Sequence, residues 1–254
     1  MNWNPEAYLT FADHRLRPAL DLIDRIPLTA PQRIVDLGCG PGNVTAQLAA
    51  RWPGAQVTGV DGDPAMLARA RADHPAVRFV AEDIAGWQPE RPVDLVFSNA
   101  ALHWLDDHAR LLPRLLLGVA KGGALAIQMP RNFMAPSHAS IRETADEGPW
   151  RDRLAPLLHG DPVAPPAFYY RLLSPVVRSL DIWESEYLHV LAGDAPVLAW
   201  LRATALRPFL AALDEPERID FAAACKERLA KSYPPERDGR TLFPFRRLFI
   251  VAIR

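Results

Sequence analysis

The chain has 254 residues, of which 49% are hydrophobic and 23% are charged, so its length and composition allow one α/β domain with an insertion around a large core. Its net charge of −1 gives no support for a surface that binds nucleic acid or an acidic membrane, and its two cysteines, Cys39 and Cys225, are too few for a disulfide framework or a cysteine-built zinc site. The N-terminus lacks a signal-peptide pattern, and charged residues interrupt each hydrophobic stretch before it reaches membrane-spanning length. We therefore expect a soluble, cytoplasmic protein, a single domain over residues 1–254, with neither nucleic acid nor membrane as a partner.

In chain order, the first predicted element is a helical lead-in over residues 3–26. From residue 34 to 128, short apolar runs then alternate with amphipathic helical stretches. The strands predicted there are 34–37, 57–61, 77–80, 93–97 and 124–128, and the helices between them are 44–51, 64–73 and 106–119. This alternation predicts an α/β fold with a doubly wound, mostly parallel sheet.

The last part of the chain departs from this alternation. Residues 131–175 are rich in proline, histidine, arginine and aromatic residues and lack a strand period, so we expect a helical lid or acceptor-binding insertion there. It would follow a cofactor-binding half over about 30–130. Further strands near 181–190 and 242–253, with helices between them, are expected to complete the sheet.

A glycine-rich loop from Asp36 to Gly42 follows the first predicted strand and opens a helix. Glycines let such a loop turn tightly and approach a ligand closely, and the first N–H groups of the helix favour a negative or polar group. Asp61 ends the second strand, about 20 residues beyond the glycines, where a carboxylate can accept both ribose hydroxyls. Asp83 follows the third strand, where it can accept from an adenine amino group. Because ligands bind at the carboxyl edge of such sheets, these strand ends predict a nucleotide-type cofactor site.

The spacing of the glycines distinguishes between two cofactors. Gly42 follows Gly40 by two positions, and Asn43 stands where the third glycine of a Gly-x-Gly-x-x-Gly dinucleotide motif would be. Asp36 can pair with the ammonium group of a methionine moiety, which a dinucleotide lacks. These features favour S-adenosylmethionine (AdoMet) and leave a nicotinamide dehydrogenase as an alternative.

Over roughly residues 34–129 these motifs resemble the class I AdoMet-dependent methyltransferases. The resemblance implies a Rossmann-like sheet of seven strands whose last strand is antiparallel. The cofactor-binding residues that it implies are Asp36, Gly38 and Gly40 at the methionine end, Asp61 at the ribose, Met66, Asp83 and Ile84 at the adenine, and Asn99 beside the methionine part.

The loop after the fourth predicted strand bears on the methyl acceptor. It reads Ser98-Asn99-Ala100-Ala101-Leu102-His103-Trp104 and lacks the Asn/Asp-Pro-Pro-aromatic run of adenine- and cytosine-N methyltransferases, which disfavours a nucleic-acid acceptor. We expect Asp106 to cap the following helix rather than to join its neighbours Asp107 and His108 in a metal site, so no metal is expected.

The flanks resemble the trans-aconitate methyltransferases. The segments that carry the resemblance are Trp3-Asn4-Pro5 with Tyr8-Leu9, Arg15 with Arg17-Pro18-Ala19, Gln128-Met129-Pro130 with Asn132, Leu206-Arg207-Pro208, and 247–252. It implies carboxyl O-methylation of trans-aconitate or a related small polycarboxylate. Residues 148–164 match no motif of the family.

A tricarboxylate carries about three negative charges at neutral pH and calls for arginines in bidentate geometry. The candidate acceptor-binding residues are Trp3, Tyr8, Arg15, Arg17, Trp104, Arg131, Tyr170, Arg207 and Arg247. The acceptor is already ionised, so no general base is expected, although Tyr8 or His14 can orient it. Two alternatives to this reading are another small-molecule methyltransferase, acting on carbon or oxygen as in quinone synthesis, and a non-catalytic AdoMet-binding subunit.

Overall fold

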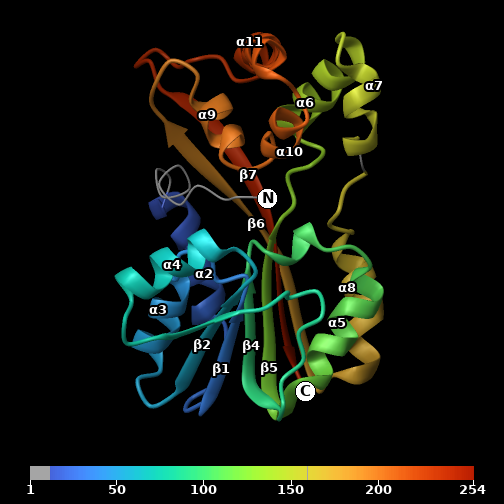
Figure 1. Cartoon of the computed structure of the whole chain (residues 1–254). Coiled ribbons are helices and arrows are strands. Elements are labelled where there is room, and N and C mark those ends of the chain that lie inside the picture. The colour runs from blue at the N-terminus through green and yellow to red at the C-terminus, as the bar shows by residue number, and fades with distance from the viewer. Residues whose placement is uncertain (1–11, 159) are drawn as a thin grey trace. The chain divides into compact units, whose positions relative to one another are not determined.

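The fold is built on a seven-stranded sheet whose strand order is β3-β2-β1-β4-β5-β7-β6 (Figure 1). The computed structural model describes residues 12–158 and 160–254. The strands are β1 (Arg33–Leu37), β2 (Gln56–Asp61), β3 (Arg78–Ala81), β4 (Val93–Asn99), β5 (Val119–Pro130), β6 (Ser179–Leu191) and β7 (Thr241–Ile253). Each predicted strand overlaps one of these, which confirms the doubly wound α/β class.

Helices connect and cover the strands. They are α2 (Ala12–Asp24), α3 (Asn43–Arg51), α4 (Pro64–Asp73), α5 (His108–Leu117), α6 (Pro136–Glu147), α7 (Arg151–Leu154), α8 (Pro166–Leu173), α9 (Pro196–Arg202), α10 (Arg207–Ala211) and α11 (Glu215–Ser232). Short 3₁₀ turns are η1 (Leu102–Trp104), η2 (Ala155–Leu157) and η3 (Ser174–Val176). Of the helices in the described ranges, none has both the length and the apolar composition that crossing a membrane requires.

The strand pairing brings the expected strand ends to one edge of the sheet. β1 pairs in parallel with β2 on one side and with β4 on the other. β2 in turn pairs in parallel with β3, and β4 pairs in parallel with β5. β7 runs antiparallel to β5, with Phe249 opposite Gln128. The antiparallel last strand that the family resemblance implies is therefore present. The carboxyl ends of the parallel strands form one ligand-binding edge.

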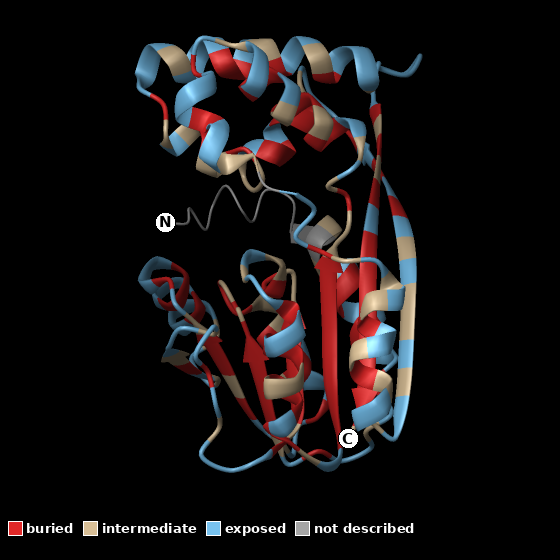
Figure 2. Ribbon diagram, turned by 90° about the vertical axis from the view of Figure 1, so that its right-hand side faces the viewer, coloured by how far each residue is buried: buried red, intermediate tan, exposed pale blue. Residues whose placement is uncertain are grey.

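Helices lie on both faces of the parallel strands. In Figure 1, α2, α3 and α4 lie on one side of these strands and α5 and α8 on the other; α2 packs against α3, and α5 packs against α8. A strand covered on both faces is apolar along its length. Accordingly Leu95, Phe97 and Ile127 are 0% exposed, and β4 and β5 are buried over most of their residues (Figure 2).

Two helix starts test the capping expected from the sequence. Asp63 caps α4 as predicted: its side chain accepts hydrogen bonds from the backbone N–H groups of Ala65 and Met66 at 2.9 and 3.0 Å. The prediction that Asp106 caps the next helix is wrong. Asp107 is the cap of α5, accepting from the Arg110 N–H at 3.3 Å. The chain enters this helix through a left-handed residue at Asp107, with φ 53°, a conformation that aspartate tolerates better than most residues.

The chain divides into two compact units, described separately below. The described parts of unit 1 are 12–130, Val163–Ser185 and Arg247–Arg254; unit 2 comprises Arg131–Pro162 and Glu186–Arg246. Unit 2 begins at the residue where the insertion was expected to begin, but residues 163–175 belong to unit 1. The description of residues 1–254 as a single domain stays a prediction.

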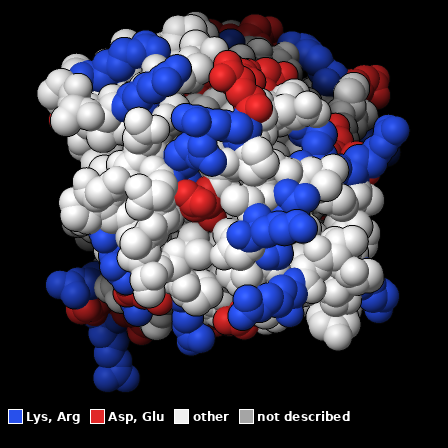
Figure 3. Space-filling view, turned by 90° about the horizontal axis from the view of Figure 1, so that it is seen from below, with Lys and Arg blue, Asp and Glu red and all other residues white. Residues whose placement is uncertain are grey.

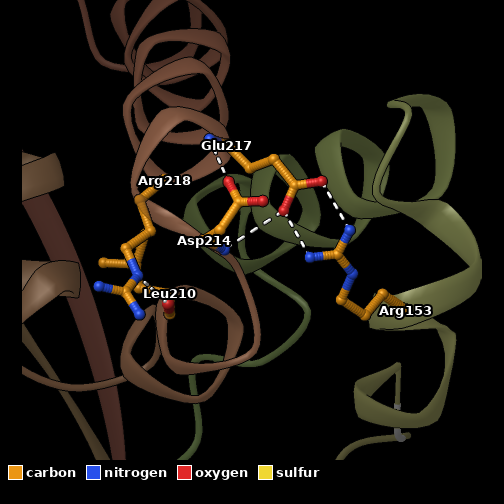
Figure 4. A network of polar contacts seen from close by, with 5 residues as sticks. All are labelled: Arg153, Leu210, Asp214, Glu217 and Arg218. Atoms are coloured by element: carbon orange, nitrogen blue, oxygen red, sulfur yellow. Dashed lines mark hydrogen bonds and ion pairs between the residues drawn. The ribbon is translucent and has the colours of Figure 1, made fainter.

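Unit 2 is a helical body around an aromatic core. Trp150 meets Phe221 edge-on, with ring centroids 5.1 Å apart, and α6 packs along α11. A surface network joins α7 to α11 (Figure 4): both guanidinium ends of Arg153 donate to Glu217, at 2.6 and 2.7 Å, while Glu217 and Asp214 form the capping box of α11. Exposed pairs of this kind are worth about 0.2–1 kcal/mol each, so the network fixes a helix terminus more than it stabilises the unit.

Charged side chains are mixed on the face drawn in Figure 3. Basic groups occur there in separate clusters, with acidic and uncharged groups between them. The basic groups therefore form no continuous tract on that face.

Candidate functional site

The glycine-rich loop after β1 requires its glycines for two different physical reasons. Gly38, Gly40 and Gly42 all have left-handed backbone, with φ of 76°, 53° and 83°. A Cβ at Gly38 would lie 2.1 Å from the Cβ of Ala101, so the loop after β4 packs directly on this position. A Cβ at Gly40 would meet no atom within 4 Å of those described. Gly38 is therefore fixed by packing, and Gly40 faces open space where a ligand can approach the backbone.

Asp61 joins this loop to the one after β2. Its Oδ2 accepts from the backbone N–H of Gly40 and its Oδ1 from that of Asp63, both at 2.8 Å. A carboxylate oxygen can accept more than one hydrogen bond, so both oxygens retain acceptor capacity for a ligand. Burial raises the pKa of the Asp61 carboxyl, and the backbone N–H groups of Asp63, Gly40 and Gly62 oppose that effect. Asp61 thus sets the shape of the cradle as well as offering oxygens to a sugar.

Asp36 is a buried carboxyl, 1% exposed, at the end of β1. The Thr45 hydroxyl donates to its Oδ2 at 2.7 Å. Burial raises the pKa of Asp36 to about 7, and the Thr45 hydrogen bond lowers it while the charge of Asp61 raises it. Burial, together with the same two carboxylates, also raises the pKa of the Cys39 thiol, which keeps that thiol protonated. A cationic ligand group beside Asp36 would favour its ionised form.

The remaining predicted cofactor residues lie on the neighbouring strand ends. Asn99 is the last residue of β4, and its buried Oδ1 has no hydrogen-bond donor among the described residues. Ile84 is half-buried, with its Cδ1 3.7 Å from a Cβ placed at Gly38. Met66 is 3% exposed, and Asp83 is exposed with one oxygen accepting from a nearby backbone N–H. The structure therefore gathers the glycines, Asp36, Asp61 and Asn99 at the carboxyl edge of adjacent strands.

These observations fit a cofactor with a cationic amino-acid end and a ribose. The buried carboxyl of Asp36 and the unsatisfied Oδ1 of Asn99 both accept hydrogen bonds, as an ammonium group requires. Gly40, where an added Cβ would meet no described atom within 4 Å, lies between Asp36 and Asp61 along the chain. The assignment of each residue to a part of the cofactor stays a prediction.

The predicted acceptor residues fall into separate groups. Trp3 and Tyr8 lie outside the described residues. In unit 1, Trp104 and Tyr170 are 42% and 60% exposed, and Arg247 is 3% exposed. The other predicted acceptor residues of unit 1 are Arg15 and Arg17 in α2, and the half-buried His14 lies in the same helix. The predicted acceptor residues of unit 2 are Arg131 and Arg207, which are both half-buried. Their roles stay predictions.

Two polar contacts of unit 1 were not expected from the sequence. His108 contacts the Tyr169 hydroxyl through Nδ1 at 2.7 Å and the Leu102 carbonyl through Nε2 at 3.0 Å. Because only an N–H can face a carbonyl oxygen, Nε2 carries a proton, and in the neutral imidazole Nδ1 then accepts from the Tyr169 hydroxyl. The imidazole therefore has a structural role between α5 and α8. Among the residues that the structure describes, no group of three or more His, Cys, Asp or Glu is placed to hold a metal ion.

Comparison with known proteins first gives the class. Residues 34–123 match a family model described as a methyltransferase domain. The fold is also that of an AdoMet-dependent methyltransferase from Thiobacillus denitrificans, solved with S-adenosyl-L-homocysteine, at 20% identity and a TM-score of 0.56 over 100% of both chains. The fold is therefore a methyltransferase fold.

Closer relatives give the family. The trans-aconitate 2-methyltransferase of Azoarcus sp. (strain BH72) is 49% identical over 99% of each chain. That of Methylobacterium radiotolerans is 47% identical over 99% of this chain and 98% of its own. This chain belongs to the trans-aconitate 2-methyltransferase family. The resemblance drawn from the flanking motifs is confirmed.

Proposed function

We propose that this protein transfers the methyl group of AdoMet to a carboxylate of trans-aconitate and so forms a monomethyl ester. The observation that carries the proposal is near-full-length similarity, at 49% identity, to a relative that bears this activity in its name. The proposal includes a cytoplasmic enzyme with a small polycarboxylate as its partner. Two buried free cysteines, Cys39 and Cys225, suit a reducing compartment.

The cofactor would be held by the residues at the carboxyl edge. Asp36 and Asn99 supply acceptors for its ammonium group, Asp61 supplies oxygens for the ribose hydroxyls, and the loop at Gly38 and Gly40 lets backbone lie against it. When bound, AdoMet supplies an electrophilic methyl carbon on a sulfonium centre. Met66, Asp83 and Ile84 are proposed for the adenine.

Acceptor binding follows from charge. Carboxyl groups of small acids have pKa values near 4, so the attacking oxygen is already ionised at neutral pH and requires no general base. The task of the chain is to hold and orient the polyanion, for which guanidinium groups are suited because they form bidentate bonds with carboxylates. The candidate arginines among the described residues are Arg15, Arg17, Arg131, Arg207 and Arg247. Orientation of the reacting oxygen is then the main source of rate acceleration.

A transfer assay with AdoMet labelled in its methyl group tests the proposal. We expect label in trans-aconitate, released as methanol by mild base because esters are base-labile. The cis isomer and the saturated tricarboxylate serve as competing acceptors. A base-stable labelled product would indicate methylation of carbon, nitrogen or an ether oxygen. Cofactor binding without transfer to any acid would favour a non-catalytic subunit, and either result contradicts the proposal.

A further inference from the structure

One buried side-chain amide, that of Gln128 in β5, is satisfied at one end only. The residue is 0% exposed. Its Oε1 accepts from Nη1 of Arg247 in β7 at 3.3 Å. Its Nε2 is also buried, and no acceptor for it exists within the described parts of the chain. Most buried polar atoms in proteins are hydrogen-bonded, so this donor calls for an explanation.

Arg247 determines the orientation of the Gln128 side-chain amide. A guanidinium group has only donors, so the end of Gln128 that faces it must be the carbonyl oxygen. The amide cannot be reversed without placing two donors face to face. The NH₂ group is therefore a buried donor with a defined position, and leaving it without an acceptor is costly to the folded protein.

The position of Gln128 in the sheet separates it from the cofactor-binding loop. It stands in register with Asn99, the last residue of β4, at the carboxyl edge of the parallel strands. β4 lies between β1 and β5, so Gln128 is two strand spacings, about 10 Å, from the strand that carries Asp36. Asn99 holds an unsatisfied acceptor on the strand next to β1, and Gln128 holds an unsatisfied donor one strand further from β1.

We propose that Gln128 binds a carboxylate of the methyl acceptor through Nε2, with Arg247 as the residue that orients its amide. A donor that a guanidinium group holds in place suits an anionic oxygen, because charge-assisted hydrogen bonds are stronger than neutral ones. This inference rests on the proposed function and makes it more specific. Gln128 then contributes to specificity, because a site built to donate to a carboxylate disfavours analogues that lack it.

Gln128→Glu tests this role with little change of shape. The new carboxylate still accepts from Arg247, but it removes the N–H donor and places a negative charge toward the acceptor. We expect KM for trans-aconitate to rise about 10- to 100-fold, the scale of a lost charge-assisted hydrogen bond, while the calorimetric Kd for AdoMet stays within about twofold. The matched control is Gln56→Glu, the same change at an exposed residue that begins β2, which should leave both constants unaltered.

A second variant and a second substrate keep the test decisive if the charge at Gln128→Glu disturbs folding. Gln128→Met is close in size and uncharged, so KM should rise less than in the glutamate variant. Wild type should also lose affinity for a dicarboxylate analogue that lacks the bound carboxyl, whereas Gln128→Met should no longer distinguish the two acids.

Failure of this inference is distinct from failure of the proposed function. If wild type methylates no polycarboxylate, the proposed function itself is wrong. If wild type methylates trans-aconitate and the KM of both Gln128 variants is unchanged, the Gln128 assignment alone is wrong. A Kd for AdoMet that rises as much as the acceptor KM would place the donor at the cofactor and also overturn the assignment.

Discussion

Asp36→Asn is expected to stabilise the cofactor-free protein at neutral and alkaline pH while it weakens AdoMet binding. Asp36 is 1% exposed, and burial raises its pKa from 3.8 to about 7. Asparagine keeps an oxygen that can accept from Thr45 but carries no charge to bury. The residue therefore opposes folding in the absence of a ligand and favours binding of a cationic one.

The size and sign of the effect follow from proton linkage. The folded protein holds the Asp36 proton more tightly than the unfolded chain, so the stability that this group contributes is fully present below pH 3.8 and is lost as pH rises through about 7. A shift of about three pKa units corresponds to about 4 kcal/mol. The free energy of unfolding of Asp36→Asn, minus that of wild type, should rise by up to about 4 kcal/mol from pH 4 to pH 8.

Urea unfolding followed by tryptophan fluorescence, at several pH values and without cofactor, measures this difference. Asp24→Asn, the same change at an exposed carboxyl in the last position of α2, is the matched control; a rise of the same size in this variant would show that burial of Asp36 is not the cause. The difference curve is required because the buried His138, with a pKa lowered to about 4, gives wild type an opposite slope over part of the range. A flat difference for Asp36→Asn would refute the burial argument.

Thr45 offers an independent check on the same carboxyl. Its hydroxyl bond lowers the pKa of Asp36, so Thr45→Val should raise that pKa further and move the pH at which AdoMet binding strengthens to a higher value. Thr45→Ser should restore the wild-type profile. Calorimetric titration between pH 6 and pH 9 reads the shift, and identical profiles for the valine and serine variants would contradict the role.

Three further changes test other residues. Asp61→Ala should weaken AdoMet binding by about 1–3 kcal/mol in calorimetry, since it loses ligand contacts and the bond to the Gly40 N–H; unchanged affinity in a folded variant would refute the ribose assignment. Arg207→Ala should raise the acceptor KM far more than the cofactor Kd, and equal effects in steady-state kinetics and calorimetry would exclude an acceptor clamp. His138→Gln should make the free energy of unfolding less sensitive to acid. The stability from the buried neutral imidazole is present above pH 6.5 and is lost as pH falls through about 4, a span worth about 3 kcal/mol. An unaltered unfolding curve at pH 4 would contradict this prediction.

The strands, the glycine loop and the acids Asp61, at the end of β2, and Asp83, after β3, could be predicted from the sequence alone. These features are local: an apolar run of a few residues predicts a buried strand, and glycine is favoured where φ is positive. Asp63 as a helix cap was equally local, since its partners lie within three residues. The class of methyl acceptor was likewise predicted from short motifs, through the family resemblance.

Which polar groups are buried, and which partners form hydrogen bonds with them, depends on how the chain packs in three dimensions. His108 and Tyr169 are 61 residues apart in the sequence, and Gln128 and Arg247 are 119 residues apart. No local sequence pattern therefore predicts either contact. The raised pKa of Asp36 likewise depends on the loss of water around a carboxyl that the sequence shows only as a strand-end acid. Desolvation and hydrogen-bond satisfaction are properties of the packed chain. For that reason the hydrogen-bonding roles of Thr45 and Gln128 become visible only in the folded structure.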